Sequence, residues 1–137
     1  MPKPADPNSE PFYWYTAEQI VQATARELEG STGQELRWMT EGVNFLPDAE
    51  AHGDLDRCLI EPVTSIDLKW DTLIAATIRY RLRTMGVEAP QWTYKEPLDE
   101  MWFISGVLPS KVASAINLAP PELRRVGIML PRTAIDI

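Results

Sequence analysis

The chain has 137 residues, of which 45% are hydrophobic, and a formal net charge of -7. This length suits one domain with a core of its own, and the composition argues against wholesale disorder. The single cysteine, Cys58, excludes an internal disulfide.

The charge is unevenly distributed along the chain. Residues 1–61 carry 12 acids and 4 bases, whereas residues 62–137 carry 8 acids and 9 bases. This balance argues against nonspecific DNA binding by the N-terminal half. An acidic half is typical of a solvated surface, and it could equally face a basic partner.

Targeting signals are the next feature that the sequence can be searched for. The N-terminus has no apolar run behind a basic start, as a signal peptide would have. No stretch approaches the roughly 18 consecutive apolar residues that a membrane span needs. We therefore expect a cytoplasmic protein that does not associate with a membrane.

The chain opens with a predicted flexible tail over residues 1–11, where four prolines stand among polar residues. An abrupt aromatic block follows at residues 12–15. This block could cover the core, or it could dock a partner, because Tyr and Trp are favoured in interfaces. Phe12, Trp14 and Tyr15 are therefore candidate partner-binding residues.

The first predicted helix spans residues 16–29. Thr16 is a good N-cap, and Gln19 three residues later completes a capping box. Tyr15 and Ile20 occupy the two positions of a hydrophobic staple around that cap, which predicts how the chain enters the helix.

A second helix is predicted over residues 32–46. Thr32 and Glu35 form another capping box, and apolar residues then recur at helical spacing. Gly42 weakens the later part, and Pro47 predicts the end of the helix.

These two helices allow two interpretations. Joined through a short turn, they could mimic a helix-turn-helix that binds DNA. The second helix offers only Gln34, Arg37 and Asn44 for phosphates and base edges, against two glutamates. A plain helical hairpin is the other interpretation.

Residues 47–64 are predicted to form a long connection with many acids. Aligned as a calcium loop that starts at Asp48, the segment places Leu59 where a bidentate Glu is needed. Cys58 and His52 are the chain's single Cys and His, too few for a zinc site without carboxylates. A Cys beside apolar residues is more often a small buried hydrophobe than a nucleophile. We predict no catalytic, cofactor-binding or metal-binding residue.

The strongest helical pattern covers residues 66–82, where apolar residues follow the spacing of an amphipathic helix. Ser65 or Asp67 could cap this helix, and Gly86 could end it. We expect it to be the central scaffold.

A basic cluster lies at the end of this helix. Arg79 and Arg83 share one helical face, while Arg81 points elsewhere. Together with Arg124 and Arg125 they could form a patch that meets an acidic partner or a nucleic-acid backbone. The alternative is a solvated face with intramolecular pairing. Arg79 and Arg83 complete the candidate partner-binding residues.

After this helix, prolines divide the chain into short pieces. Helices are predicted over about 97–103, 110–118 and 121–127, each with a Pro or Ser at its start. Residues 128–130 could form a short strand or an extended tail.

Several short motifs in residues 61–128 resemble an uncharacterised group of small actinobacterial proteins. The matching residues are mostly Trp, Pro and Arg: Glu61 with Pro62, Trp70 with Asp71, Ala89 with Pro90, Trp92 with Thr93, Trp102 with Phe103, Ala119 with Pro120, Arg124 with Arg125, and Gly127 with Ile128. Members of the group are described as regulators or antitoxin-like proteins, some encoded beside a nucleotidyltransferase-like protein. The resemblance implies a partner-binding or neutralising role and no catalytic residue.

The sequence thus predicts a mainly α fold: a single compact helical domain over residues 12–137, with about five helices and a Pro-rich, partly irregular C-terminal half. We expect no enzyme and no cofactor. The expected function is that of a regulatory accessory protein that masks a protein partner, such as a toxin or a nucleotidyltransferase-like neighbour. The alternative is a DNA-binding transcriptional regulator that uses residues 16–29 and 32–46. The sequence leaves the oligomeric state open.

Overall fold

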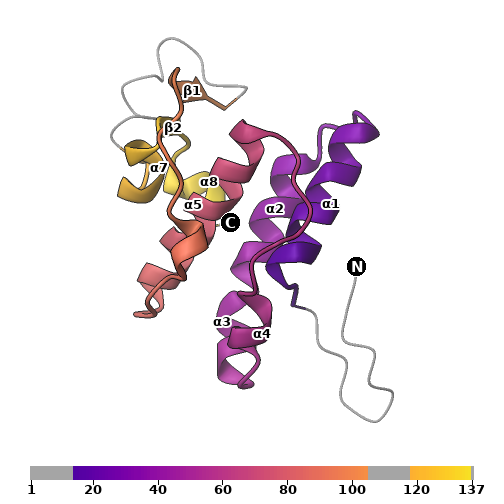
Figure 1. The fold of residues 1–137 in the computed structure, drawn as a ribbon, viewed down its shortest axis with the longest axis vertical. Coiled ribbons are helices and arrows are strands. Elements are labelled where there is room, and N and C mark those ends of the chain that lie inside the picture. Colours follow the sequence, from indigo (N-terminus) through magenta and orange to yellow (C-terminus); the bar gives the residue numbers. More distant parts are fainter. Residues whose placement is uncertain (1–13, 105–117, 137) are drawn as a thin grey trace. The chain divides into compact units, whose positions relative to one another are not determined.

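The computed structural model of the chain describes residues 14–104 and 118–136 and is mainly α-helical, as predicted (Figure 1). The chain divides into two compact units, which comprise residues 1–66 and residues 67–137. A single domain over residues 12–137 stays a prediction. The predicted tail at 1–11 and most of the predicted helix at 110–118 lie outside the described residues.

The first unit contains helices α1 (Ala17–Glu29), α2 (Glu35–Asn44), α3 (Leu46–Ala51) and α4 (Leu55–Cys58). The predicted start of α1 is confirmed: Thr16 Oγ1 accepts a hydrogen bond from the Gln19 amide, and Gln19 Oε1 accepts one from the Thr16 amide. Both bonds satisfy backbone donors that a helix start otherwise leaves open.

Helices α1 and α2 lie side by side as a hairpin (Figure 1). Gly42 is the point of close approach, because a Cβ there would lie 2.8 Å from Ile20 Cγ1 and 3.6 Å from Tyr15 Cδ2. The glycine that weakens α2 by propensity is therefore the residue that lets α1 pack closely against it.

The predicted capping box at Thr32 is wrong. Gln34 stands at the N-cap of α2 and makes no side-chain capping bond. The Thr32 hydroxyl instead donates to Glu27 Oε1 at 2.9 Å and accepts from the Gln34 amide, so it belongs to the turn after α1.

The long connection predicted over residues 47–64 is also wrong for its first part, which holds α3 and α4. Helix α2 ends at Asn44, before Pro47 as expected, and Pro47 lies in the first turn of α3, where a helix needs no amide donor. Ala49, Leu55 and Cys58 are buried and attach these short helices to the core.

The second unit is built on α5 (Leu68–Thr84), the predicted central helix. Asp67 caps it by accepting from the Trp70 amide at 2.8 Å, and Gly86 follows its end with a φ of +73°. Nine of its residues are buried, which is the expected property of a scaffold helix.

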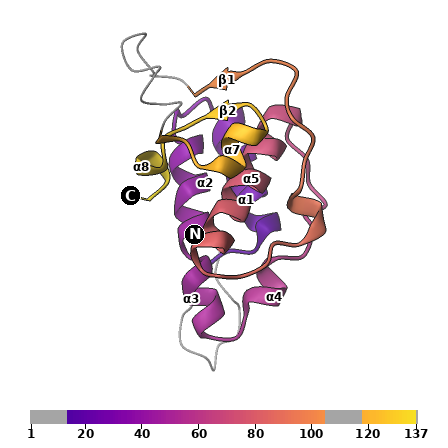
Figure 2. The same cartoon turned by 90° about the vertical axis from the view of Figure 1, so that its left-hand side faces the viewer.

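The rest of the second unit consists of short elements: the 3-10 helix η1 (Gln91–Thr93), strands β1 (Trp102–Phe103) and β2 (Ile128–Met129), and helices α7 (Pro121–Arg125) and α8 (Arg132–Ile135). The predicted helix near 121 is confirmed, and of the two alternatives for residues 128–130 the structure shows the short strand. Figure 2 shows β1 and β2 side by side, and they pair in parallel.

The helix predicted over residues 97–103 is wrong. The Leu98 amide donates to the Val126 carbonyl at 3.0 Å, and the Trp102 amide donates to the Gly127 carbonyl at 2.7 Å. The Trp102 ring also meets the Trp70 ring of α5 edge-on, with centroids 5.3 Å apart. In this segment, contacts with partners distant in sequence therefore take the place of the hydrogen bonds of a helix.

In the parts of the chain that the structure describes, none of the helices combines the length and the apolar composition needed to cross a lipid bilayer.

Candidate anion-binding pocket in the second unit

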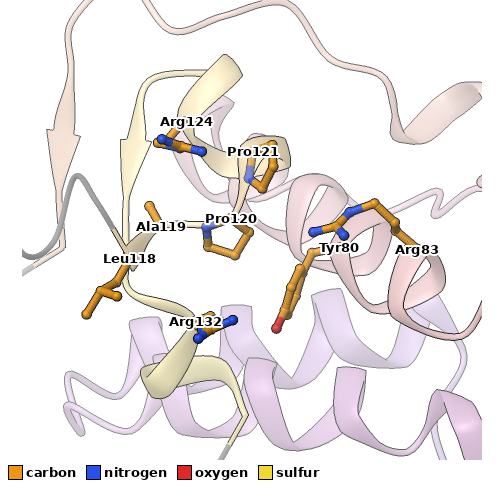
Figure 3. Close-up of a pocket in the computed structure, with 8 residues that line it drawn as sticks. All are labelled: Tyr80, Arg83, Leu118, Ala119, Pro120, Pro121, Arg124 and Arg132. Atoms are coloured by element: carbon orange, nitrogen blue, oxygen red, sulfur yellow. The ribbon is translucent and has the colours of Figure 1, made fainter.

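A pocket of about 300 Å³ lies in the second unit (Figure 3). Three elements and the segment before α7 contribute its lining, which combines arginines with prolines and other apolar groups: Tyr80, Arg83, Leu118, Ala119, Pro120, Pro121, Arg124 and Arg132. The pocket therefore presents cationic groups beside an apolar wall.

Prolines fix the backbone around this pocket. Pro120 stands at the N-cap of α7 with a φ of -58°, and Pro121 occupies the first turn. Pro131 precedes α8 with a φ of -63°, and Arg132 begins that helix. Because a proline ring restricts φ, the segments that carry Arg124 and Arg132 lose little backbone freedom when a ligand binds.

Arg83 reaches from α5 to Glu122 of α7. Its Nε lies 2.5 Å from Glu122 Oε2, and its Nη2 lies 3.3 Å from Oε1. The hydrogen bond to this carboxylate raises the pKa of Arg83, despite the opposing effect of burial. The positive charge of Arg83 is therefore partly offset within the protein.

Asp136 connects α8 to α5 beside the pocket. Tyr80 Oη donates to Asp136 Oδ2 at 2.7 Å, and Arg81 Nη2 lies 2.5 Å from Oδ1. Burial first, and then the hydrogen bond to Asp136, raises the pKa of Tyr80. Tyr80 is therefore a neutral phenol at physiological pH, and its proton is directed to Asp136.

All three arginines of the pocket are exposed, and Arg124 and Arg132 differ from Arg83 in their ion pairing. Within residues 14–104 and 118–136, no ion pair with a carboxylate engages either guanidinium. Each guanidinium offers a planar set of N–H donors that fits carboxylate or phosphate oxygens. This arrangement can bind an anionic group.

The structure brings together only part of the predicted basic patch. Arg83 and Arg124 line one pocket, as their grouping in the sequence anticipated, whereas Arg125 on the same helix does not line it. Arg79 lies elsewhere, with its guanidinium carbon 4.3 Å from the centroid of the Tyr94 ring. Arg132 was missed by sequence reasoning, because its place in the pocket depends on how α8 attaches to α5.

Two of the aromatic candidates are buried in the first unit. Trp14 is 4% exposed, and its Nε1 donates to Asp54 Oδ2 at 2.6 Å. Tyr15 is 2% exposed, and its ring lies 6.2 Å from that of Phe45. Burial favours the core interpretation of both over the docking patch. Phe12 lies outside the described residues.

Cys58 has the properties of a buried structural thiol. Its Sγ lies 4.0 Å from Asp54 Oδ2, and burial raises its pKa to about 11. The reactive form of cysteine is the thiolate, which is scarce at neutral pH when the pKa is this high. The geometry therefore favours the structural interpretation over a nucleophile.

The acidic segment around His52 gathers no metal site in the described residues, where no three His, Cys, Asp or Glu side chains group around a common point. The His52 ring instead lies 5.0 Å from the Trp14 ring, and its Nδ1 lies 2.8 Å from the Asp48 carbonyl oxygen.

Comparison with protein-family models, curated proteins and solved structures finds no match for this chain. The resemblance to the actinobacterial group therefore stays a prediction. The function has to be argued from the pocket.

Proposed function

We propose that this chain is a non-enzymatic binding protein, and that its second unit binds an acidic protein partner through the arginine-lined pocket. The observation that carries the proposal is the pair Arg124 and Arg132, two exposed cations that line one pocket and share it with an apolar wall. Each of these two arginines can form a charge-assisted hydrogen bond with a carboxylate that a partner supplies, and such bonds stabilise the complex.

The lining of the pocket favours a protein partner over a nucleic acid. Leu118, Ala119, Pro120 and Pro121 give it an apolar wall next to the arginines. An acidic peptide can fill both parts, because its carboxylates meet the cations and its apolar atoms meet the prolines.

The charge of the whole chain supports the same choice. Residues 67–137 carry 8 acids and 9 bases, and residues 1–66 carry 12 acids and 4 bases. A duplex presents dense phosphate charge, and proteins that bind it without sequence preference need many cations on one surface. A short acidic segment needs only the local positive charge of the pocket.

The resemblance implies a specific form of this function, in which the chain masks a toxin-like or nucleotidyltransferase-like partner. The alternative is a DNA-binding regulator that uses α1 and α2. Arg37 on α2 is exposed, which a DNA contact requires. The close packing of Gly42 on Ile20 suits a plain hairpin as well as a DNA-binding motif, so it gives the alternative no specific support. We therefore favour binding through the pocket.

The proposal can be tested by selecting, from a displayed library of random peptides, those that bind the full chain. We expect enrichment of Asp and Glu beside apolar residues, and binding at least about tenfold weaker to Arg124→Ala and Arg132→Ala, since a charge-assisted hydrogen bond contributes that much. Arg125→Ala is the matched control, because it removes the same charge from the same helix outside the pocket.

Absence of acidic enrichment, or enrichment that survives both pocket substitutions, would contradict the proposal. Salt-dependent retardation of duplex DNA that Arg37→Ala abolishes, without any acidic peptide selected, would support the alternative instead. Co-expression with the product of the adjacent gene, followed by size-exclusion chromatography, tests the masking form.

A further inference from the structure

We infer that the pocket of the second unit contains a subsite for a single oxyanion, either a carboxylate or a phosphate, which Arg124 and Arg132 hold together. The inference rests on the proposed function, because it uses the same pocket, and it specifies which chemical group enters. It also requires that the group bind by itself, without the rest of a partner protein.

The first argument is that two arginines from different elements line one pocket. Arg124 belongs to α7 and Arg132 to α8, and Figure 3 shows them on either side of Pro120, which also lines the pocket. An oxyanion accepts hydrogen bonds from several directions. Arg124 and Arg132 are exposed, long side chains on separate helices, and each can turn its planar guanidinium toward an oxyanion bound in the pocket that they share.

The second argument is the state of the third arginine in the pocket. The Arg83 side chain is 54% exposed, while that of its partner Glu122 is 7% exposed. The buried carboxylate therefore has little access to a ligand, whereas part of the Arg83 guanidinium faces solvent. Part of the Arg83 guanidinium can therefore face a bound anion while its ion pair with Glu122 stays intact.

The third argument is that the backbone at Arg132 is held in place before any ligand arrives. The Asp136 amide donates to the Arg132 carbonyl at 2.8 Å, and the Asp136 carboxylate binds Tyr80 and Arg81 of α5. The turn that presents Arg132 is thus attached to the scaffold helix. Such preorganisation reduces the conformational entropy that binding would otherwise cost.

The size of the pocket limits what can bind. Its volume of about 300 Å³ is at the lower end of the range for small-molecule sites. One oxyanion with a short carbon chain on the apolar wall suits this volume, and a dinucleotide cofactor does not.

Titration of the full-length chain with inorganic phosphate and, separately, with glutarate tests the inference at constant ionic strength. Nuclear magnetic resonance would follow the arginine Nε–H signals and the amides of residues 118–136. We expect saturable shifts confined to the pocket, and at least about tenfold weaker binding to Arg124→Ala and to Arg132→Ala, as expected for loss of a charge-assisted hydrogen bond. The ratio of the two affinities identifies the preferred source of the oxyanion.

Arg125→Ala is again the matched control and should bind both anions as the unaltered chain does. Shifts that grow linearly without saturation, or an equal loss of binding in Arg124→Ala and Arg125→Ala, would overturn the inference. Because Arg124 and Arg132 are exposed, we expect the substituted chains to fold. Arg124→Lys and Arg132→Lys keep the charge and test whether the guanidinium fork itself is needed.

The two proposals can fail separately. If neither anion binds, but peptide binding depends on Arg124 and Arg132, the subsite is wrong and the acidic protein partner stands. If both anions bind through these arginines, but no acidic peptide is selected, the subsite stands and the protein partner is wrong.

Discussion

Arg83 and Glu122 form a two-point ion pair between α5 and α7, with Nε 2.5 Å from Oε2 and Nη2 3.3 Å from Oε1. The burial of the two partners is unequal, because the Glu122 side chain is 7% exposed and that of Arg83 is 54% exposed. The carboxylate has lost most of its water and depends on the guanidinium to compensate. The pair therefore stabilises the position of α7, which also carries Arg124.

This inequality predicts that Arg83→Met destabilises the chain, because it leaves a buried carboxylate without its partner. We expect a loss of about 1–3 kcal/mol, reduced from the value for fully buried pairs because Arg83 is half exposed. The double substitution Arg83→Met with Glu122→Gln should recover part of that loss. Urea denaturation of the four chains measures the coupling, and strictly additive losses would refute the dependence of Glu122 on Arg83.

Elements whose starts are encoded locally were predicted well from the sequence. The capping box of Thr16 with Gln19 and the cap at Asp67 both involve residues three apart, so the pattern contains the interaction. Thr32 had an equally good pattern, but its hydroxyl found the Glu27 carboxylate at the end of α1. The capping-box pattern considers only the residue three positions after the cap, so it cannot indicate a competing hydrogen-bond acceptor in the preceding helix.

The C-terminal half was predicted less well because its structure depends on distant partners. Residues 97–103 take their conformation from hydrogen bonds to residues 126–127, which no local signal specifies. The prediction of the pocket residues from the sequence was limited in the same way. The sequence grouped Arg83 with Arg124, but the addition of Tyr80 and Arg132 depends on how α8 attaches to α5.

Gly42→Ala should destabilise the first unit even though alanine is the better helix former. The new Cβ would lie 2.8 Å from Ile20 Cγ1, a distance that forces the helices or the side chain to move. We expect the cost of overpacking, about 1–3 kcal/mol, to exceed the gain of about 1 kcal/mol in helix propensity.

Thermal and urea denaturation measure the effect of Gly42→Ala. Ile20→Ala supplies the matched control, since it removes the atom that the new methyl group meets. Gly42→Ala should cost less in the Ile20→Ala background than in the unaltered chain. An equal cost in both backgrounds would show that Ile20 is not the obstacle.

Cys58 should react slowly with alkylating reagents in the folded chain. Burial raises its pKa to about 11, and its side chain is 0% exposed. At pH 8 this pKa lowers the thiolate fraction about a hundredfold relative to an ordinary thiol, before access is considered. Mass spectrometry after iodoacetamide treatment, with and without urea, measures the rates. Similar rates in both conditions would contradict the buried position.

Glu18 should stabilise the first unit only when it is ionised. Its carboxylate accepts hydrogen bonds from the Thr64 hydroxyl, from the Thr64 amide and from the Val63 amide, and these bonds lower its pKa. Because the pKa of the folded state lies below that of the unfolded state, the contribution is fully present above about pH 5. It is lost as the pH falls through the folded-state value.

Urea denaturation of Glu18→Gln and of the unaltered chain at pH 7 and at about pH 2.5 tests this pH dependence. Glu18→Gln should be the less stable chain at pH 7, and the difference should shrink at the lower pH. Glu50→Gln, at an exposed position of α3, is the matched control and should change little at either pH. A difference for Glu18→Gln that is independent of pH would mean that the charge of the carboxylate is not what holds residues 63–64.

Asp136→Asn should weaken oxyanion binding through Arg132, although Asp136 does not line the pocket. The carboxylate binds Tyr80 Oη and Arg81 Nη2, and its loss loosens the turn that begins at Arg132. We expect a fall in affinity of about threefold to tenfold, the range for ordering one mobile side chain. The phosphate titration proposed above measures it.

A positioning role for Asp136 can be distinguished from a general loss of stability. If Asp136 acts through Arg132, then Asp136→Asn should weaken phosphate binding in the unaltered chain and have no further effect in Arg132→Ala. The pair Asp136→Asn with Arg124→Ala should instead show both losses, because Arg124 is carried by α7 and not by α8. Additive losses with both arginines would mean that Asp136 stabilises the pocket as a whole rather than the turn that presents Arg132.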